Sequence, residues 1–163
     1  MPLVSHPSLG LPPHDMKAGH PEAAARLLAS RATLGARALE IAVDRDPTLT
    51  DRYSEAGLRH LLRDTEILID RLSQSVASGD AYFMTSFTDQ SVPVYRRRRV
   101  PMDDVANLIG SIGVAMASIL GPEERADGDA AIEEAVKVLR WHRRIGGDAR
   151  RRNPILSALY RGG

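Results

Sequence analysis

Apolar residues recur every three or four positions along most of residues 21–145, which is the spacing of one face of an α-helix. The clearest stripe falls within residues 51–77 and consists of Leu58, Leu61, Leu62, Thr65, Ile69, Leu72 and Val76. Ile67 and Leu68 widen this stripe, so we expect a central helix that contacts more than one neighbour. Gly79 follows the stripe and is suited to the left-handed conformation that closes a helix.

Four further segments show the helical spacing, and they cover residues 21–45, 81–98, 102–120 and about 127–145. Thr48 or Thr50 is expected to cap the 51–77 helix at its start. Pro93 falls inside the 81–98 segment, where a proline costs about 3 kcal/mol, so we expect a kink or two short pieces there. The pattern as a whole predicts a single all-α domain of five to six helices, with a globin-like or helical-bundle architecture.

The chain of 163 residues divides into three parts. Residues 1–20 have no apolar periodicity, so we predict a disordered N-terminal arm. Residues 21–147 form the predicted helical domain, and residues 148–163 are a basic tail with a short amphipathic segment. We read no signal peptide and no bilayer-spanning stretch, so a cytoplasmic protein without membrane contact is expected. The absence of cysteine excludes disulfides and thiolate chemistry.

Basic residues are concentrated in two places although the net charge is only +1. Arg96–Arg99 form one run, and seven further arginines follow from Arg140 onward, against the single acid Asp148. Such runs suit an acidic partner surface, an anionic ligand or a nucleic acid, and they also occur as solvated faces or at helix C-termini. The candidate partner-binding residues are Arg96, Arg97, Arg98, Arg99, Arg150, Arg151, Arg152, Ile155, Leu156, Leu159 and Tyr160.

A second set of residues is a candidate for ligand binding. His60 and Asp64 lie four apart on the predicted central helix, and such a pair can orient an imidazole for haem or metal ligation or for proton transfer. The alternative is a structural, surface-facing or helix-pairing histidine. An aromatic cluster of Tyr82, Phe83 and Phe87 is expected to plug the core or to form the wall of a ligand pocket.

Two glycines, Gly110 and Gly113, make the 102–120 helix slim. Glycine inside a helix costs up to about 1 kcal/mol relative to alanine, so close approach of another helix or of a flat ligand is expected there.

Motifs typical of catalysis are missing. A di-metal carboxylate bundle needs a Glu-x-x-His pair, and neither a glycine-rich phosphate loop after a strand nor a nucleophile elbow is found. We therefore expect no catalytic residues, no designed metal site and no enzyme activity.

Two short motifs resemble a known family. Arg52-Tyr53, with Gly57 and Arg63-Asp64-Thr65 after it, is followed by Val100-Pro101-Met102-Asp103-Asp104-Val105. Across about residues 47–120 this pattern resembles bacterial helical sensory domains that precede cobalamin-binding domains in regulators. It is more loosely similar to the non-haem, globin-like input domains of stressosome proteins. The resemblance implies an all-α, often dimeric signal-input domain without catalytic activity. Ile67-Leu68 stand where an aromatic–histidine pair is expected, so the resemblance does not extend to a cobalamin ligand.

These observations favour a non-enzymatic, ligand-responsive or docking module in bacterial signalling that acts through dimerisation and through its C-terminal tail. Three alternatives stay open: a haem or tetrapyrrole protein with His60 as ligand, a structural protein that docks through its tail, and a nucleic-acid-binding regulator that uses Arg96–Arg99 and the basic tail. The cofactor is unknown, with a tetrapyrrole, an apolar ligand or none as the options.

Overall fold

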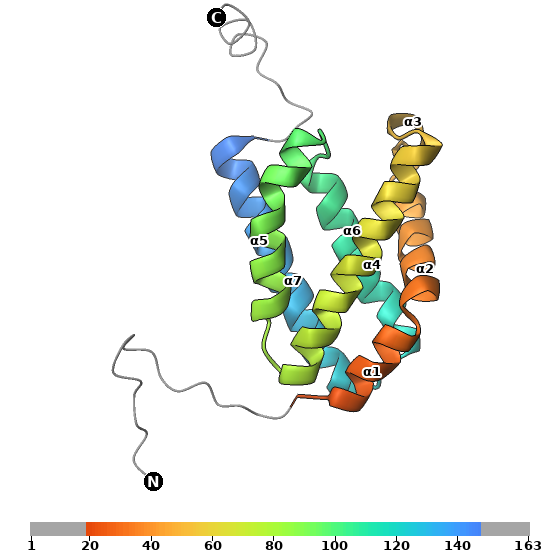
Figure 1. Ribbon diagram of the computed structural model, residues 1–163, viewed down its shortest axis with the longest axis vertical. Coiled ribbons are helices and arrows are strands. Elements are labelled where there is room, and N and C mark those ends of the chain that lie inside the picture. The colour runs from red at the N-terminus through yellow and green to blue at the C-terminus, as the bar shows by residue number, and fades with distance from the viewer. Residues whose placement is uncertain (1–18, 148–163) are drawn as a thin grey trace, which may run out of the picture.

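The computed structural model describes residues 19–147, which fold into seven α-helices and one short 3-10 helix without any β-strand (Figure 1). In chain order the elements are α1 (Pro21–Ala29), α2 (Arg31–Arg45), α3 (Leu49–Arg52), α4 (Glu55–Ser78), α5 (Tyr82–Arg97), α6 (Met102–Ala115), η1 (Met116–Ser118) and α7 (Pro122–Gly146). The predicted all-α single domain is confirmed, with one α-helix more than the upper expectation of six. The expectations for residues 1–18 and 148–163 lie outside the described residues.

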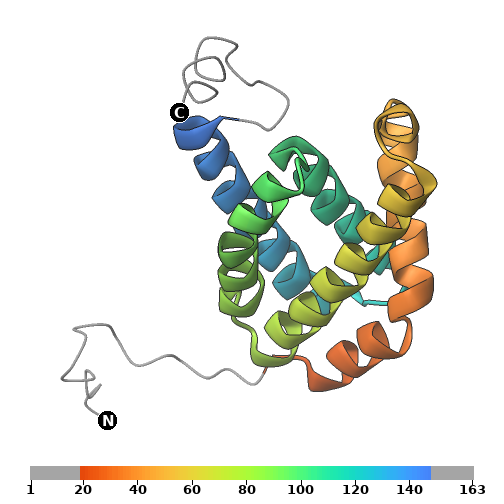
Figure 2. The same cartoon turned by 45° about the horizontal axis from the view of Figure 1, so that its top comes forward.

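Helix α4 lies at the centre of the molecule, as its wide apolar stripe predicts. It packs against α1, α2, α5, α6 and α7, and the two cartoon views show it crossing the middle of the bundle (Figures 1 and 2). Helix α6 packs between α2 and α7. Of the two residues expected to widen the apolar stripe, Leu68 is buried in the core, as is its neighbour Ile69, whereas Ile67 is 42% exposed.

The core is built almost entirely from aliphatic side chains. Its largest fully buried members are Leu27, Leu49, Leu61, Leu68, Ile69, Leu72, Met84, Met102, Leu108, Ile109, Ile112 and Met116. Burying one such side chain is worth about 1.5–3 kcal/mol, so this set supplies the main drive for folding. The aromatic residues of the chain contribute little, because only Tyr95 among those described is buried.

Two predicted helices are interrupted in the structure. The segment expected to run unbroken from residue 21 to 45 breaks at Ser30, between α1 and α2. The helix expected to start at residue 51 is divided into the single turn α3 and the long α4. Ser54 rather than a threonine caps α4, because its Oγ accepts a hydrogen bond of 3.1 Å from the N–H of Gly57.

Other boundaries follow from local chemistry. Gly79 closes α4 with φ of 68°, as predicted. Helix α5 is continuous through Pro93, which is exposed, so the expected division into two pieces is wrong. Helix α6 ends at Ala115 and leads into η1, earlier than residue 120. Helix α7 starts at Pro122 rather than near 127, because the Glu124 carboxylate accepts a 2.9 Å hydrogen bond from the Gly121 N–H and caps this start.

The folded domain begins slightly earlier than residue 21. The N–H of His20 donates a 2.8 Å hydrogen bond to the carbonyl of Val76, so His20, assigned to the arm from the sequence, is held against the end of α4. Among the helices formed by residues 19–147, none combines the length and the apolar character needed to cross a bilayer.

Candidate functional site

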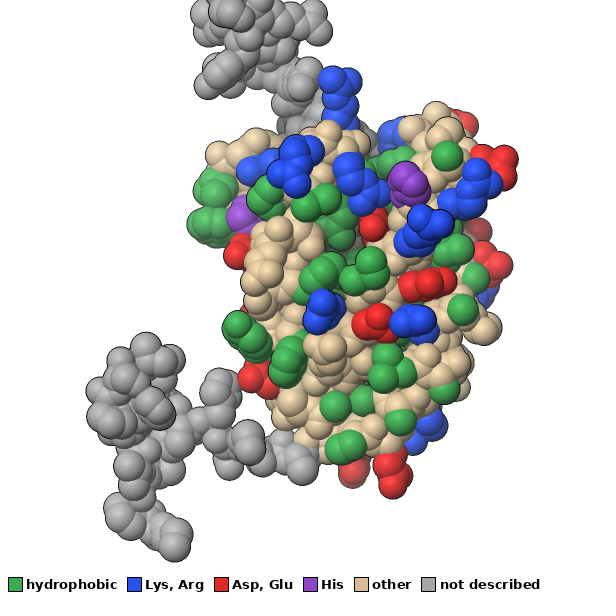
Figure 3. All heavy atoms as spheres, in the orientation of Figure 1, with side chains coloured by type: hydrophobic (Ala, Val, Ile, Leu, Met, Phe, Trp, Pro, Cys, Tyr) green, Lys and Arg blue, Asp and Glu red, His purple; other side chains and the backbone are tan. Residues whose placement is uncertain are grey.

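The C-terminal ends of α5 and α7 lie at the same end of the bundle as the start of α4 (Figure 1). Lys and Arg side chains gather at this end of the space-filling view, with hydrophobic side chains between them (Figure 3). We call this surface the basic end and define it by the arginines at the ends of the two helices: Arg96, Arg97, Arg98, Arg99, Arg140, Arg143 and Arg144. It therefore unites the Arg96–Arg99 run with a second group that is more than 40 residues away in the sequence.

Three arginines of the basic end have partners inside the domain. Arg98 forms an ion pair with Asp64 of α4 at 2.9 Å, and Arg143 forms one with Asp103 of α6 at 3.0 Å. Arg96 donates a 3.1 Å hydrogen bond to the carbonyl of His142, near the C-terminus of α7, where a cation also complements the helix dipole. These three side chains tie α5 and α7 to their neighbours.

The other four arginines are exposed: Arg97, Arg99, Arg140 and Arg144. No carboxylate within the described part of the chain lies close enough to form an ion pair with any of them. Four guanidinium groups are therefore available at one end of the bundle, and a guanidinium binds carboxylates or phosphates through paired hydrogen bonds.

Arg99 has an unfavourable backbone conformation. Its φ of 58° is left-handed, and it is the only residue other than glycine with a positive φ in residues 19–147. Gly79 closes α4 at nearly the same angle, 68°, with the residue type that this conformation favours. A left-handed conformation costs a residue with a Cβ about 1–2 kcal/mol. The conformation closes α5, because the N–H of Val100 donates a 2.9 Å hydrogen bond to the carbonyl of Tyr95 and the N–H of Arg99 donates one of 3.1 Å to the carbonyl of Arg96, as in a Schellman motif.

Large apolar side chains are exposed on the same two helices. Trp141 is 50% exposed and Ile145 is 63% exposed, and their spacing of four residues places them on one face of α7. Val94 of α5 is 39% exposed. The basic end thus combines arginines with a tryptophan and aliphatic groups, which is the composition enriched at the centres of protein–protein interfaces.

A partly buried ion network, which we call the Arg52 network, joins the end of α3 to the first turn of α6. Asp104, only 3% exposed at its side chain, accepts a 2.7 Å hydrogen bond from Arg52 and a 2.6 Å hydrogen bond from the hydroxyl of Tyr53. Arg52 also pairs with Asp46 at 2.8 Å. The hydrogen bond that Arg52 donates to Asp104 raises the pKa of Arg52 above its ordinary value, and the one that Arg52 donates to Asp46 lowers the pKa of Asp46.

The Arg52 network is linked to the basic end through the first turn of α6. Asp104 faces inward to Arg52, whereas its neighbour Asp103 pairs outward with Arg143 of α7. Two consecutive carboxylates therefore connect the α3 loop with the end of α7. Arg52 and Tyr53 thus meet Asp104 in space, although more than 50 residues separate them from it in the sequence.

Asp64 pairs with an arginine rather than with the expected histidine. Its carboxylate accepts hydrogen bonds of 2.9 and 3.2 Å from Arg98, and partial burial raises its pKa although Arg98 opposes this shift. His60 is exposed, and within the described residues its ring makes no hydrogen bond or ion pair with Asp64. Nearby, burial raises the pKa of the Tyr95 hydroxyl.

The aromatic cluster does not plug the core. Tyr82 is 62% exposed and Phe83 is 38% exposed, and their rings contact each other edge to face at 5.9 Å. Phe87 is partly buried, with the guanidinium of Arg71 5.1 Å from its ring centre. The expectation of a core plug is therefore wrong for the first two residues, whose place at the start of α5 leaves them at the surface.

The slim helix is explained by helix packing. A Cβ on Gly113 would lie 3.1 Å from Cδ1 of Ile132, so α6 and α7 approach closely there. A Cβ on Gly110 would lie 3.3 Å from a guanidinium nitrogen of Arg45 at the end of α2. Neighbouring protein groups thus occupy both glycine positions, in agreement with the helix-packing alternative.

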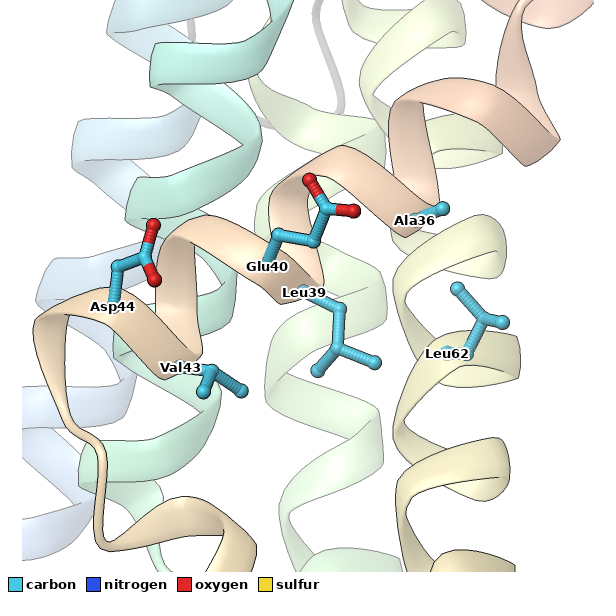
Figure 4. A pocket seen from close by; sticks show the side chains of 6 residues that line it. All are labelled: Ala36, Leu39, Glu40, Val43, Asp44 and Leu62. Carbon is cyan, nitrogen blue, oxygen red and sulfur yellow. The ribbon is translucent and has the colours of Figure 1, made fainter.

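A shallow groove lies between α2 and α4. It has a volume of about 360 Å³ and is lined by Ala36, Leu39, Glu40, Val43, Asp44 and Leu62 (Figure 4). Neither His60 nor the aromatic cluster lines this α2–α4 groove, so a tetrapyrrole site with His60 as ligand gains no support from their positions. Within residues 19–147, no three histidine or carboxylate side chains are grouped to hold a metal ion.

Comparison with protein-family models and with curated proteins found no match to this chain. Sequence reasoning singled out the arginines of α5 but missed Trp141, Ile145 and Val94, because an amphipathic stripe does not show which large apolar residues stay exposed. A sequence pattern that could have identified these three residues is a large apolar residue close to arginines near the predicted end of a helix.

Proposed function

We propose that this chain is a non-catalytic protein-docking module that recruits an acidic surface of a partner protein through the basic end. The observation that carries the proposal is the set of four exposed arginines that have no carboxylate partner among residues 19–147, next to the exposed Trp141 and Ile145.

The physical reason lies in how such groups bind. Docking removes water from Trp141 and Ile145, and the loss of apolar surface from water supplies binding free energy. The arginines around them then pair with partner carboxylates in a less polar environment, where each charged hydrogen bond is stronger than in bulk water. Apolar anchors give affinity, and the surrounding charges select an acidic partner.

A regulatory role accords with this proposal, since the resembled sensory domains transmit signals by binding other proteins. Self-association into a dimer stays a prediction, and sedimentation analysis of the purified chain tests it. Nucleic acid is the competing anionic partner. It is less favoured because exposed aliphatic side chains lie among the arginines, whereas phosphate-binding surfaces are strongly charged and polar.

The test compares the proteins captured by three immobilised versions of the full chain. The first is the natural chain, the second carries Arg97→Glu, Arg140→Glu and Arg144→Glu, and the third is a charge-matched control. The control carries Arg37→Glu, Arg125→Glu and Lys137→Glu, three positions outside the basic end whose cations are already paired with neighbouring acids; Arg37 and Lys137 are exposed and Arg125 is partly buried. Lysate from the organism that encodes the chain is used with and without nuclease.

The proposal predicts a protein that the natural chain and the control retain after nuclease treatment and that the basic-end variant loses. Charge reversal on the acidic surface of that protein should restore its binding to the basic-end variant. Equal capture by all three versions would remove the basic end from consideration. Capture that nuclease abolishes would reassign the basic end to nucleic acid.

A further inference from the structure

The α2–α4 groove is an unoccupied apolar surface with an acidic margin. In the close-up, Leu39 and Val43 project from the side of α2 that faces Leu62 of α4, and Glu40 and Asp44 project from the opposite side (Figure 4). Glu40 is held only in an exposed pair with Arg37, and Asp44 has no cationic partner among residues 19–147. A peptide with aliphatic side chains and a cationic flank matches both features.

The chain itself contains such a segment. Ile155, Leu156 and Leu159 are spaced so that they share one face of a helix, and Asn153-Pro154 is a favourable start for one. Three consecutive arginines, Arg150–Arg152, precede this segment. The segment therefore offers an apolar face for the floor of the groove and a cationic flank for its acidic margin.

We infer that residues 150–160 of the same chain bind the α2–α4 groove, with residues 154–160 as a short helix whose apolar face lies on Leu39, Val43 and Leu62. Arg150–Arg152, which precede this helix, then lie beside Asp44 and Glu40. This is the helix-in-groove mode of peptide recognition. The inference does not depend on the proposed function, because the groove and the basic end are separate surfaces.

The length of the connection permits binding within one chain. Seven residues separate Gly147, the last described residue, from Ile155, and the eight Cα–Cα steps between these two residues span up to about 26–29 Å when extended. Helix α6 packs against both α7 and α2, so where these two helices flank α6 their axes are at most two interhelical spacings apart, about 16–20 Å. The C-terminal ends of α2 and α7 also lie toward the same end of the bundle (Figure 1). A short tether of this kind gives an effective concentration in the millimolar range, so a weak contact suffices.

A spin-label experiment on the full chain tests the inference. The sequence has no cysteine, so Ser157→Cys introduces a single attachment point for a nitroxide. The predicted result is a loss of amide NMR intensity confined to the groove, at residues such as Ala36, Leu39, Val43 and Leu62, which returns when the nitroxide is reduced. Intensity loss elsewhere, or none at the groove, would overturn the inference.

Matched variants test the chemistry of the contact. Glu40→Lys with Asp44→Lys should restore the groove intensities, whereas Glu133→Lys with Glu134→Lys should not. The control pair has the same charge change and lies exposed on α7. Ile155→Asp with Leu159→Asp should also restore the intensities, and it leaves the described domain untouched. Persistence of the intensity loss in both the groove and the segment variants would contradict the proposed contact.

A mixed sample identifies which chain supplies the segment. Isotope-labelled chain without nitroxide is combined with unlabelled chain that carries the nitroxide, so only contacts between molecules reduce intensity. The inference predicts unchanged groove intensities in this mixture. Intensity loss in the mixture equal to that in the singly labelled chain would assign the segment to a second copy and overturn binding within the chain.

Discussion

Replacing Asp104 with alanine tests the Arg52 network, and we expect it to lower the free energy of unfolding by about 2–4 kcal/mol. Removing one partner of a buried ion pair costs about 3–5 kcal/mol, because the other charge is left uncompensated. We lower this figure because the Arg52 side chain is 23% exposed and keeps its 2.8 Å pair with Asp46. The hydroxyl of Tyr53 also loses its 2.6 Å acceptor.

Thermal unfolding monitored by circular dichroism measures this loss. For a domain of about 130 residues, an unfolding entropy of about 2.1 cal/mol/K per residue converts 3 kcal/mol into a decrease in Tm of about 11 °C. Asp103→Ala is the matched control, since Asp103 is 49% exposed and its pair with Arg143 is worth about 0–1 kcal/mol. Equal destabilisation by Asp103→Ala and Asp104→Ala would refute the reasoning.

Three further predictions address single residues. Arg99→Gly should be more stable than Arg99→Ala by about 1 kcal/mol in urea unfolding, because both variants remove the charge and only glycine readily adopts a φ of 58°; equal stabilities would contradict strain at this position. Ser54→Ala should destabilise the domain by about 1 kcal/mol through loss of the α4 cap, and an unchanged urea midpoint would show that the cap is dispensable. Burial raises the pKa of the Asp64 carboxyl above its ordinary value of 3.8, so the native state binds the carboxyl proton more tightly than the unfolded state does. As the pH rises above 3.8 the unfolded state loses this proton first, so the stability that Asp64 contributes falls. The unfolding free energy of the natural chain minus that of Asp64→Asn should therefore decrease from about pH 3.8 upward; an increase would show that the ion pair with Arg98 dominates.

The fold class could be predicted because it depends on local periodicity. The stripe of α4 identifies a central helix, and Gly79 identifies its end, since both signals lie within the helix itself. The break at Ser30 could not be predicted in the same way. No glycine or proline marks it, and apolar positions continue on both sides. The break is instead stabilised by packing, because α1 lies on α4 whereas α2 contacts both α4 and α6.

The candidate site was predictable only in part, because its contacts join distant segments. The run Arg96–Arg99 is visible in the sequence, but its meeting with Arg140 and Arg144 requires α5 and α7 to end side by side. Arg52 and Asp104 are 52 residues apart, and only the family resemblance had brought their motifs together.

The pairing of Asp64 with Arg98 shows the same limit. The spacing of four residues along one helix suggested His60 as the partner of Asp64, whereas in the structure Arg98, at the end of α5, donates hydrogen bonds to the Asp64 carboxylate.

The most direct test of docking through the basic end uses the only tryptophan of the chain, Trp141, which is 50% exposed there. Acrylamide quenching of its fluorescence is measured for the chain alone and after addition of the purified partner from the capture experiment, prepared without tryptophan. The account predicts that the bound partner shields Trp141, so quenching weakens, and that Arg97→Glu with Arg140→Glu and Arg144→Glu abolishes this protection. A partner that binds while the quenching of Trp141 stays unchanged would contradict the account.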